Sequence, residues 1–181
     1  MKQKTIINQR SSFWANLFKR PTEMSELKNL LKSIPAFENL NSKYLNMLIK
    51  ITHNRNYEEN EFVFYQGDPG MCLYIVRSGK VVISYLNDNN TEINLANYET
   101  GDFFGELALI DGETRAASAY ATEKTNLTIL FKPDLDEFIK KFPTKGIEIQ
   151  QGIMKIITTR LRNLYNEYFE LSKKLFGENK K

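Results

Sequence analysis

The sequence predicts an α+β fold, in which an antiparallel, jelly-roll-like β-roll follows N-terminal helices and precedes one long C-terminal helix. Six of the nine glycines lie between positions 67 and 112, so turn-rich sequence occupies the middle of the 181-residue chain. Strand-like segments recur there about every 8–12 residues, which favours an antiparallel roll or sandwich over alternating βα units. Helical periodicity occurs before this region and again after Lys132.

Two short helices are expected ahead of the strands. Four apolar residues of the first recur at i, i+3, i+4 and i+7, namely Leu27, Leu30, Leu31 and Ile34. Pro35 ends this helix, because proline lacks the amide hydrogen that a helix interior requires. Ser42 is the expected cap of the second helix. The apolar face of that helix carries Leu45, Leu48 and Ile49.

Six strands are expected in the middle of the chain, because β-branched and aromatic residues cluster there between turn residues. They comprise residues 62–65, 72–76, 81–85, 93–98, 116–121 and 127–131. A short helix follows over 133–142, with Pro133 at its start and Pro143 at its end.

The longest periodic pattern belongs to the C-terminal helix. Its stripe alternates spacings of three and four over about four heptads. The stripe comprises Ile147, Gln150, Met154, Ile157, Leu161, Leu164, Tyr168, Leu171 and Leu175. The whole helix could lie on its own domain, but the stripe is longer than a roll of this size can cover. We therefore expect a homodimer formed through the distal half of this helix.

The charge is divided along the chain. Residues 1–34 hold seven Lys and Arg against two acids, and residues 144–181 hold eight against four. Residues 35–143 hold ten basic residues against sixteen acids, so the expected folded body is acidic. A DNA-binding protein is expected to carry a basic patch on its body, so no direct DNA binding is expected here.

The composition excludes several classes of protein. No apolar run approaches the roughly 18 residues of a membrane-spanning helix, and no apolar segment follows the first residues as in a secretory signal. Cys72 is the only cysteine, which excludes a disulfide framework and favours a cytoplasmic location. His53 is the only histidine, which removes most metal sites and histidine-based catalysis. The expected protein is not an enzyme and binds no metal.

The first twenty residues carry five basic side chains and no acid, interleaved with Phe13, Trp14 and Phe18. This composition fits a segment that contacts a membrane surface or a partner protein. It also fits a tail whose aromatic side chains dock on the domain, which is the favoured interpretation.

The segment 101–119 contains the residues that are expected to bind a ligand. Gly105 permits a tight turn and close approach to a ligand, and residues 106–110 can form one helical turn whose amides bind an anion. Arg115 follows nine residues after Glu106 and can pair with the same anion. A carboxylate beside a phosphate is understandable if the ligand also presents a hydroxyl, as a ribose does. Glu106 and Arg115 taken alone would be an ordinary surface ion pair, but their context favours a compact sugar phosphate.

Residues 104–110 and 115–118 resemble the phosphate-binding cassette of cyclic nucleotide-binding domains. The resemblance is to the regulatory subunits of cAMP-dependent protein kinase above all, and to catabolite activator-type proteins. It extends through 34–37, 67–68 and 74–79, and covers about residues 26–170. It implies a β-roll of about eight strands.

The resemblance also implies roles for individual residues. Arg115 would neutralise the cyclic phosphate, and Glu106 would accept a hydrogen bond from the ribose 2′-hydroxyl. Backbone amides would hold the phosphate and ribose near Gly105, Leu107, Ala108, Ala116 and Ala117. The last helix would cap the base, with Leu161, Leu164 and Tyr165 as candidates. Relatives that select cGMP often carry Thr at the position of Ala116, so cAMP is the expected ligand and cGMP the less favoured one.

The expected organisation has four parts: a basic, aromatic tail (1–21), a cyclic nucleotide-binding roll with flanking helices (22–145), a capping and dimerisation helix (146–176) and a short tail (177–181). The expected function is a stand-alone cAMP receptor that takes part in signal transduction. It would signal to an unidentified effector protein by repositioning its C-terminal helix. A degenerate roll used as a ligand-independent interaction domain, and a transcription regulator without its own DNA-reading helix, are the alternatives.

Overall fold

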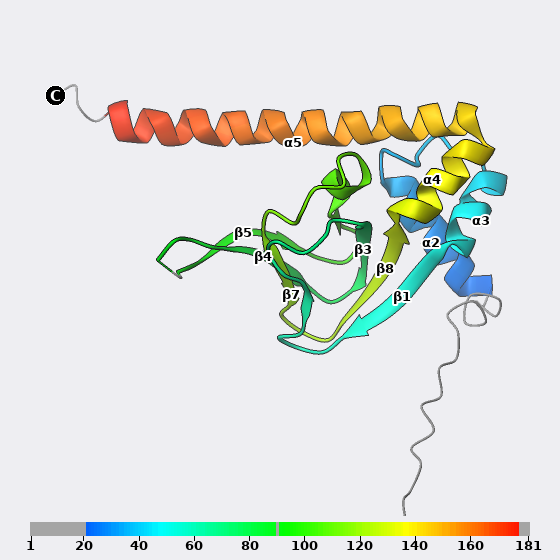
Figure 1. Ribbon diagram of the computed structural model, residues 1–181, viewed down its shortest axis with the longest axis horizontal. Coiled ribbons are helices and arrows are strands. Elements are labelled where there is room, and N and C mark those ends of the chain that lie inside the picture. Colours follow the sequence, from blue (N-terminus) through cyan, green and yellow to red (C-terminus); the bar gives the residue numbers. More distant parts are fainter. Residues whose placement is uncertain (1–20, 90, 178–181) are drawn as a thin grey trace, which may run out of the picture.

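The computed structural model describes residues 21–89 and 91–177, which form a roll of two four-stranded antiparallel sheets with helices at one end (Figure 1). One sheet has the strand order β1-β8-β3-β6 and the other has the order β2-β7-β4-β5. The strands are β1 (Thr52–Tyr57), β2 (Phe62–Phe64), β3 (Cys72–Ser78), β4 (Val81–Leu86), β5 (Glu92–Tyr98), β6 (Phe103–Phe104), β7 (Ser118–Ala121) and β8 (Thr125–Phe131). The predicted fold class is confirmed.

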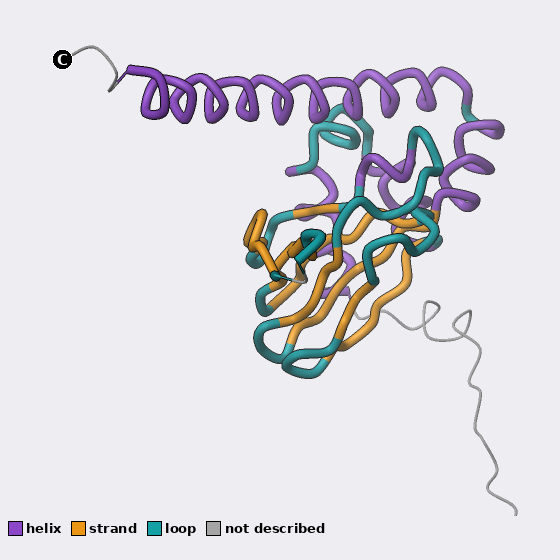
Figure 2. The backbone as a smooth tube through the Cα atoms, turned by 60° about the vertical axis from the view of Figure 1, so that its left-hand side comes forward, coloured by secondary structure: helices purple, strands orange, loops and turns teal. Residues whose placement is uncertain are grey.

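Four α-helices flank the sheets within the described residues: α2 (Pro21–Ser33), α3 (Ser42–Lys50), α4 (Lys132–Lys141) and α5 (Pro143–Gly177). Figure 2 shows the strands as one layered body with the helices gathered at its end. The cap of α3 is Asn41 rather than the predicted Ser42, because the Asn41 side chain accepts hydrogen bonds from the amides of Lys43 and Tyr44. The basic N-terminal segment (1–20) and the last four residues lie outside the described residues.

Two apolar clusters hold the fold together. The first packs the helices against β3 and β8, and it includes Leu31, Leu48, Ile75 and Leu130, all with essentially no exposed surface. The second fills the space between the two sheets. Each fully buried side chain of this kind stabilises the fold by about 1.5–3 kcal/mol relative to leaving it exposed.

Strands β1 and β6 were not among the six predicted. In β1 only the end residues, Thr52 and Tyr57, are buried, and the residues between them are polar and mostly exposed. Pairing with β8 in the register Thr52↔Leu130 therefore defines this strand, and no alternating apolar pattern marks it in the sequence. β6 has two residues, which is too short for any periodic pattern.

The face of α5 that packs on the domain is not the predicted stripe. Ile149, Ile153 and Ile156 are buried against the other helices. Gly152 lies among them, and a Cβ added there would be only 2.3 Å from the carbonyl oxygen of Pro35 and 2.4 Å from the Cα of Ala36. Glycine at this position therefore lets α5 approach the 34–40 loop closely.

Most of the predicted stripe is exposed. Ile157 packs against the helical core, whereas Ile147, Met154, Leu161, Leu164, Tyr168, Leu171 and Leu175 are exposed. The distal half of α5 extends beyond the end of the helical layer (Figure 1). Among the helices of residues 21–177, none combines the length and apolar character needed to cross a bilayer.

Candidate functional site

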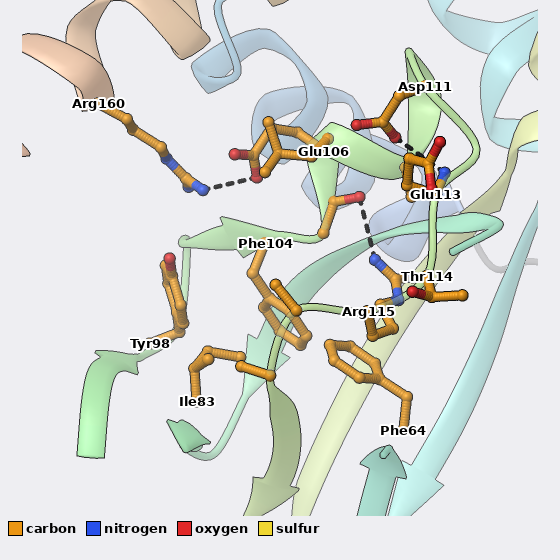
Figure 3. A pocket seen from close by; sticks show the side chains of 15 residues that line it. Phe64, Ile83, Tyr98, Phe104, Glu106, Asp111, Glu113, Thr114, Arg115 and Arg160 are labelled. Atoms are coloured by element: carbon orange, nitrogen blue, oxygen red, sulfur yellow. Dashed lines mark hydrogen bonds and ion pairs between the residues drawn. The ribbon is translucent and has the colours of Figure 1, made fainter. Parts of the chain in front are cut away.

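A cavity of about 330 Å³ opens between the β6–β7 connection, the inner face of one sheet and α5 (Figure 3). All seven residues predicted to hold the ligand line it: Gly105, Glu106, Leu107, Ala108, Arg115, Ala116 and Ala117. The remaining lining residues are Phe64, Ile83, Tyr98, Phe104, Asp111, Glu113, Thr114 and Arg160.

Gly105 connects β6 to a short 3₁₀ helix, η1 (Glu106–Leu109). Its φ of +80° lies in the left-handed region, where glycine has no steric penalty. A Cβ here would lie 2.8 Å from Nη1 of Arg115 and 2.9 Å from the Cys72 carbonyl oxygen. The predicted helical turn is present as η1. Glycine is required at position 105 for two reasons, the positive φ and the lack of space for a Cβ beside Arg115.

Arg115 is held from both sides through its backbone. Its amide donates to the carbonyl oxygen of Asp68, and its carbonyl oxygen accepts from the amide of Gly67, each at 2.8 Å. The turn at 67–70, which the sequence marks by glycine and proline, thus positions the predicted anion-binding residue. The glycine and proline residues that predict this turn thus also shape the backbone that holds Arg115 at the cavity.

The Arg115 side chain is 8% exposed and lies against aromatic rings. Its Nη2 donates to the carbonyl oxygen of Cys72 at 2.8 Å, and its Cζ lies 4.3 Å from the ring centroid of Phe64. Its Nε is buried without a hydrogen-bond partner, and no carboxylate of the described residues forms an ion pair with it. A buried cation with a free donor is costly unless an anion binds it, so this end of the cavity is suited to an anion.

Glu106 is 4% exposed and pairs with a residue that the sequence did not suggest. Its Oε2 accepts a hydrogen bond from Nη1 of Arg160 at 2.6 Å. Nη2 of Arg160 donates to the carbonyl oxygen of Phe103 at 2.9 Å, and its Cζ lies 5.2 Å from the Phe103 ring centroid. Arg160 thus ties α5 to the carboxylate predicted to bind a hydroxyl.

Arg160 is a cavity residue that the sequence did not predict. It precedes Leu161 of the predicted stripe, and nothing in the local sequence separates it from Arg162 two positions later. Only the rotation of α5 on the domain decides which arginine reaches the cavity. The three candidate base caps, Leu161, Leu164 and Tyr165, are exposed on α5 and do not line the cavity in this arrangement.

The lower side of the cavity in Figure 3 is apolar and aromatic. Tyr98, the last residue of β5, stacks on Phe104 with ring centroids 5.3 Å apart. Burial raises the pKa of the Tyr98 hydroxyl, and nearby Arg160 opposes this shift. The cavity therefore combines a cationic end, a carboxylate and a flat apolar wall, which together suit a sugar phosphate that carries a base.

Comparisons with known proteins agree with this geometry. Residues 54–142 match the model of one protein family, the cyclic nucleotide-binding domain. The chain is 33% identical over 132 residues to a cyclic AMP receptor protein of Thermus thermophilus, covering 73% of this chain and 59% of that protein.

Two solved structures are also similar. The catabolite activator protein of Thermus thermophilus superposes with a TM-score of 0.67 at 33% identity, over 76% of this chain and 63% of that one. The regulatory domain of Toxoplasma gondii PKA with cAMP gives 0.63 at 31% identity, over 70% of this chain and 48% of that one. The chain thus spans less than two thirds of the length of each of these relatives.

Proposed function

Because residues 54–142 belong to the cyclic nucleotide-binding domain family, we propose that this chain is a cAMP receptor that regulates another protein. One observation carries the proposal. The buried Arg115 guanidinium lines the cavity, keeps a free Nε donor and has no carboxylate partner in the described part of the chain. An anionic ligand supplies that partner, and a cyclic phosphate beside a ribose fits the neighbouring Glu106.

In this proposal the residues of the β6–β7 connection divide the ligand between them. Arg115 binds the cyclic phosphate together with backbone amides around Leu107, Ala108, Ala116 and Ala117. Glu106 accepts from the ribose 2′-hydroxyl through the carboxylate oxygen that Arg160 does not occupy. The phosphate and the ribose of a cyclic nucleotide would thus bind different charged side chains of the cavity, Arg115 and Glu106.

The preference for cAMP over cGMP rests on Ala116, which offers no hydroxyl next to the cassette arginine. One similar structure, the Toxoplasma gondii PKA regulatory domain, is a complex with cAMP. The expected discrimination is modest, because one neutral hydrogen bond contributes only about 0.5–1.5 kcal/mol.

The signal is proposed to leave the site through α5. The ribose hydroxyl and Arg160 share the Glu106 carboxylate, so ligand binding alters the contact that holds α5 at the cavity. The ligand can shift α5 only if it binds one helix position better than another. Capping of the base by Leu161, Leu164 and Tyr165 provides that difference, since these residues reach the ligand only after α5 moves.

The exposed apolar residues of distal α5 are the proposed contact surface for a second copy. Leu164, Tyr168, Leu171 and Leu175 are exposed at heptad spacing. The effector is proposed to be another protein in the cytoplasm, and the chain itself is proposed to be a regulator rather than an enzyme.

Calorimetry with cAMP and cGMP tests the function. We expect the wild-type chain to bind both, with cAMP preferred. Arg115→Ala should weaken cAMP binding roughly 30-fold or more, because loss of one partner of a buried charge pair typically costs about 2–5 kcal/mol. Arg55→Ala is the matched control, because Arg55 is exposed on β1 and pairs with Glu61. No heat of binding with either nucleotide would leave the roll as a ligand-independent interaction domain.

A further inference from the structure

The charged and the apolar side chains of the cavity come from different elements, and they meet where Arg115 lies against Phe64. Arg115, Glu106 and Arg160 stand on the side formed by the β6–β7 connection and α5. The side formed by β2, β4, β5 and β6 presents Phe64, Ile83, Tyr98 and Phe104. With the phosphate at Arg115 and the ribose at Glu106, this second side is the surface inside the cavity that a base can lie against.

Tyr98 is the one residue of that wall with a hydrogen-bonding side chain, among the described residues that line the cavity. The tyrosine hydroxyl both donates and accepts. Phe64, Ile83 and Phe104 offer only apolar surface. Stacking against such surface is tolerant of base identity, because every base has a flat face. Any side-chain hydrogen bond that this wall makes to a base must therefore come from Tyr98.

The ring of Tyr98 is fixed by its neighbours. Its backbone is paired with Val81 at the end of the β4–β5 ladder. One side of the ring stacks on Phe104, and the Cζ of Arg160 lies 5.7 Å from the ring centroid. In Figure 3 the phenol oxygen points toward the part of the cavity where Arg160 meets Glu106. The hydroxyl is thus held in one direction before any ligand arrives.

The Tyr98 hydroxyl also has no hydrogen-bond partner among the described residues, although the side chain is partly buried. Burial raises its pKa, so it stays protonated and neutral at physiological pH. A fixed, protonated and unpaired hydroxyl at the wall of a ligand cavity is suited to bind a polar atom of the ligand.

We propose that the Tyr98 hydroxyl hydrogen-bonds the polar edge of the bound base, and that Tyr98 therefore contributes to base specificity. This inference rests on the proposed cyclic nucleotide function. It assigns to β5 a role that is separate from the phosphate contacts of Arg115 and from the ribose contact of Glu106.

The test compares Tyr98→Phe with the wild type against a panel of cyclic nucleotides, by calorimetry. Tyr98→Phe keeps the ring that stacks on Phe104 and removes only the hydroxyl. We expect it to weaken cAMP binding about three- to ten-fold, as loss of one hydrogen bond does. The panel adds cAMP analogues that each lack one polar atom of the base edge, by deletion of the 6-amino group or replacement of a ring nitrogen by carbon. The loss caused by Tyr98→Phe should disappear for one of these analogues and persist for the others.

The controls separate the alternatives. Tyr120→Phe removes a hydroxyl from β7, where the ring packs against Phe62 outside the cavity, and should bind cAMP as the wild type does. 2′-Deoxy-cAMP tests the ribose, because a Tyr98→Phe effect that vanishes with this ligand would assign the hydroxyl to the ribose and overturn the inference. An equal loss with every base analogue, or no loss with cAMP, also overturns it. If the wild-type chain binds no cyclic nucleotide, the proposed function and this inference both fail.

Discussion

Nη1 of Arg160 lies 2.6 Å from Oε2 of Glu106, across 54 residues of sequence. The pair joins the middle of α5 to the first residue of η1, and the Glu106 end is buried. The position of α5 and the charge at the cavity are therefore linked through this ion pair. Under the proposed function, a ligand would shift this contact only if it favoured another position of α5.

Arg160→Ala should release α5 from the cavity. The carboxylate of Glu106 then stays buried without its partner, so we expect a loss of about 1–3 kcal/mol in the free energy of unfolding. Hydrogen exchange should rise over residues 157–175 and remain unchanged in β3 and β8. Arg162→Ala is the matched control, because Arg162 is exposed on the same helix. Equal exchange in the two variants would show that Arg160 does not restrain the helix.

Ala116→Thr should narrow the difference in affinity between cAMP and cGMP. The added hydroxyl lines the cavity directly after Arg115, so it can bind a polar group of guanine. The gain for cGMP should be about 0.5–1.5 kcal/mol, measured by competition between the two nucleotides. Ala116→Val has a similar shape without the hydroxyl and should leave the ratio unchanged. A gain for cGMP with valine as well would point to shape rather than hydrogen bonding.

Truncation after Asn163 should produce two separable defects. It removes Leu164 and Tyr165, two candidate caps, so cAMP binding should weaken. It also removes Tyr168, Leu171 and Leu175, so any dimer seen by sedimentation should dissociate. Replacing Tyr168 and Leu171 by serine in the full chain keeps the caps and should affect only the dimer. A truncated chain that remains dimeric would place the interface elsewhere.

Gly152→Val should force α5 away from the 34–40 loop. A Cβ at this position meets backbone atoms of Pro35 and Ala36, which cannot rotate aside. Overpacking of this kind typically costs about 1–3 kcal/mol, so the midpoint of urea unfolding should fall. Met154→Val introduces the same residue at an exposed position of α5 and should have little effect. Similar midpoints for the two variants would contradict the close packing at Gly152.

The grouping of the predicted site residues around one cavity could be predicted because these residues are close in the sequence. Gly105, Glu106 and Arg115 lie within eleven positions, and the backbone turns between them bring them to one cavity. The rotation of α5 could not be predicted in this way. Its buried residues Ile149, Ile153 and Ile156 and its exposed stripe are both apolar at helical spacing, so periodicity alone does not say which faces the domain.

Strand β1 and the contact between Arg160 and Glu106 depend on residues that are far apart in the sequence. Strand β1 is polar between its buried ends, and its partner β8 lies about 70 positions later in the sequence. Arg160 reaches Glu106 because α5 packs on the domain, with Gly152 against the 34–40 loop. Neither feature leaves a local pattern in the sequence.

The close packing at Gly152 also makes α5 a lever. At 1.5 Å per residue, Arg160 lies roughly 12 Å along the helix from Gly152, whereas Leu175 lies roughly 35 Å from it. If the helix turns as a rigid rod about Gly152, a displacement of 1 Å at Arg160 becomes about 3 Å at Leu175. A displacement of Arg160 that is just large enough to break its hydrogen bond to Glu106 thus produces a larger displacement at the far end of the helix. A displacement of about 3 Å at Leu175 is larger than close-packed side chains can accommodate, so it can decide whether two apolar surfaces fit together.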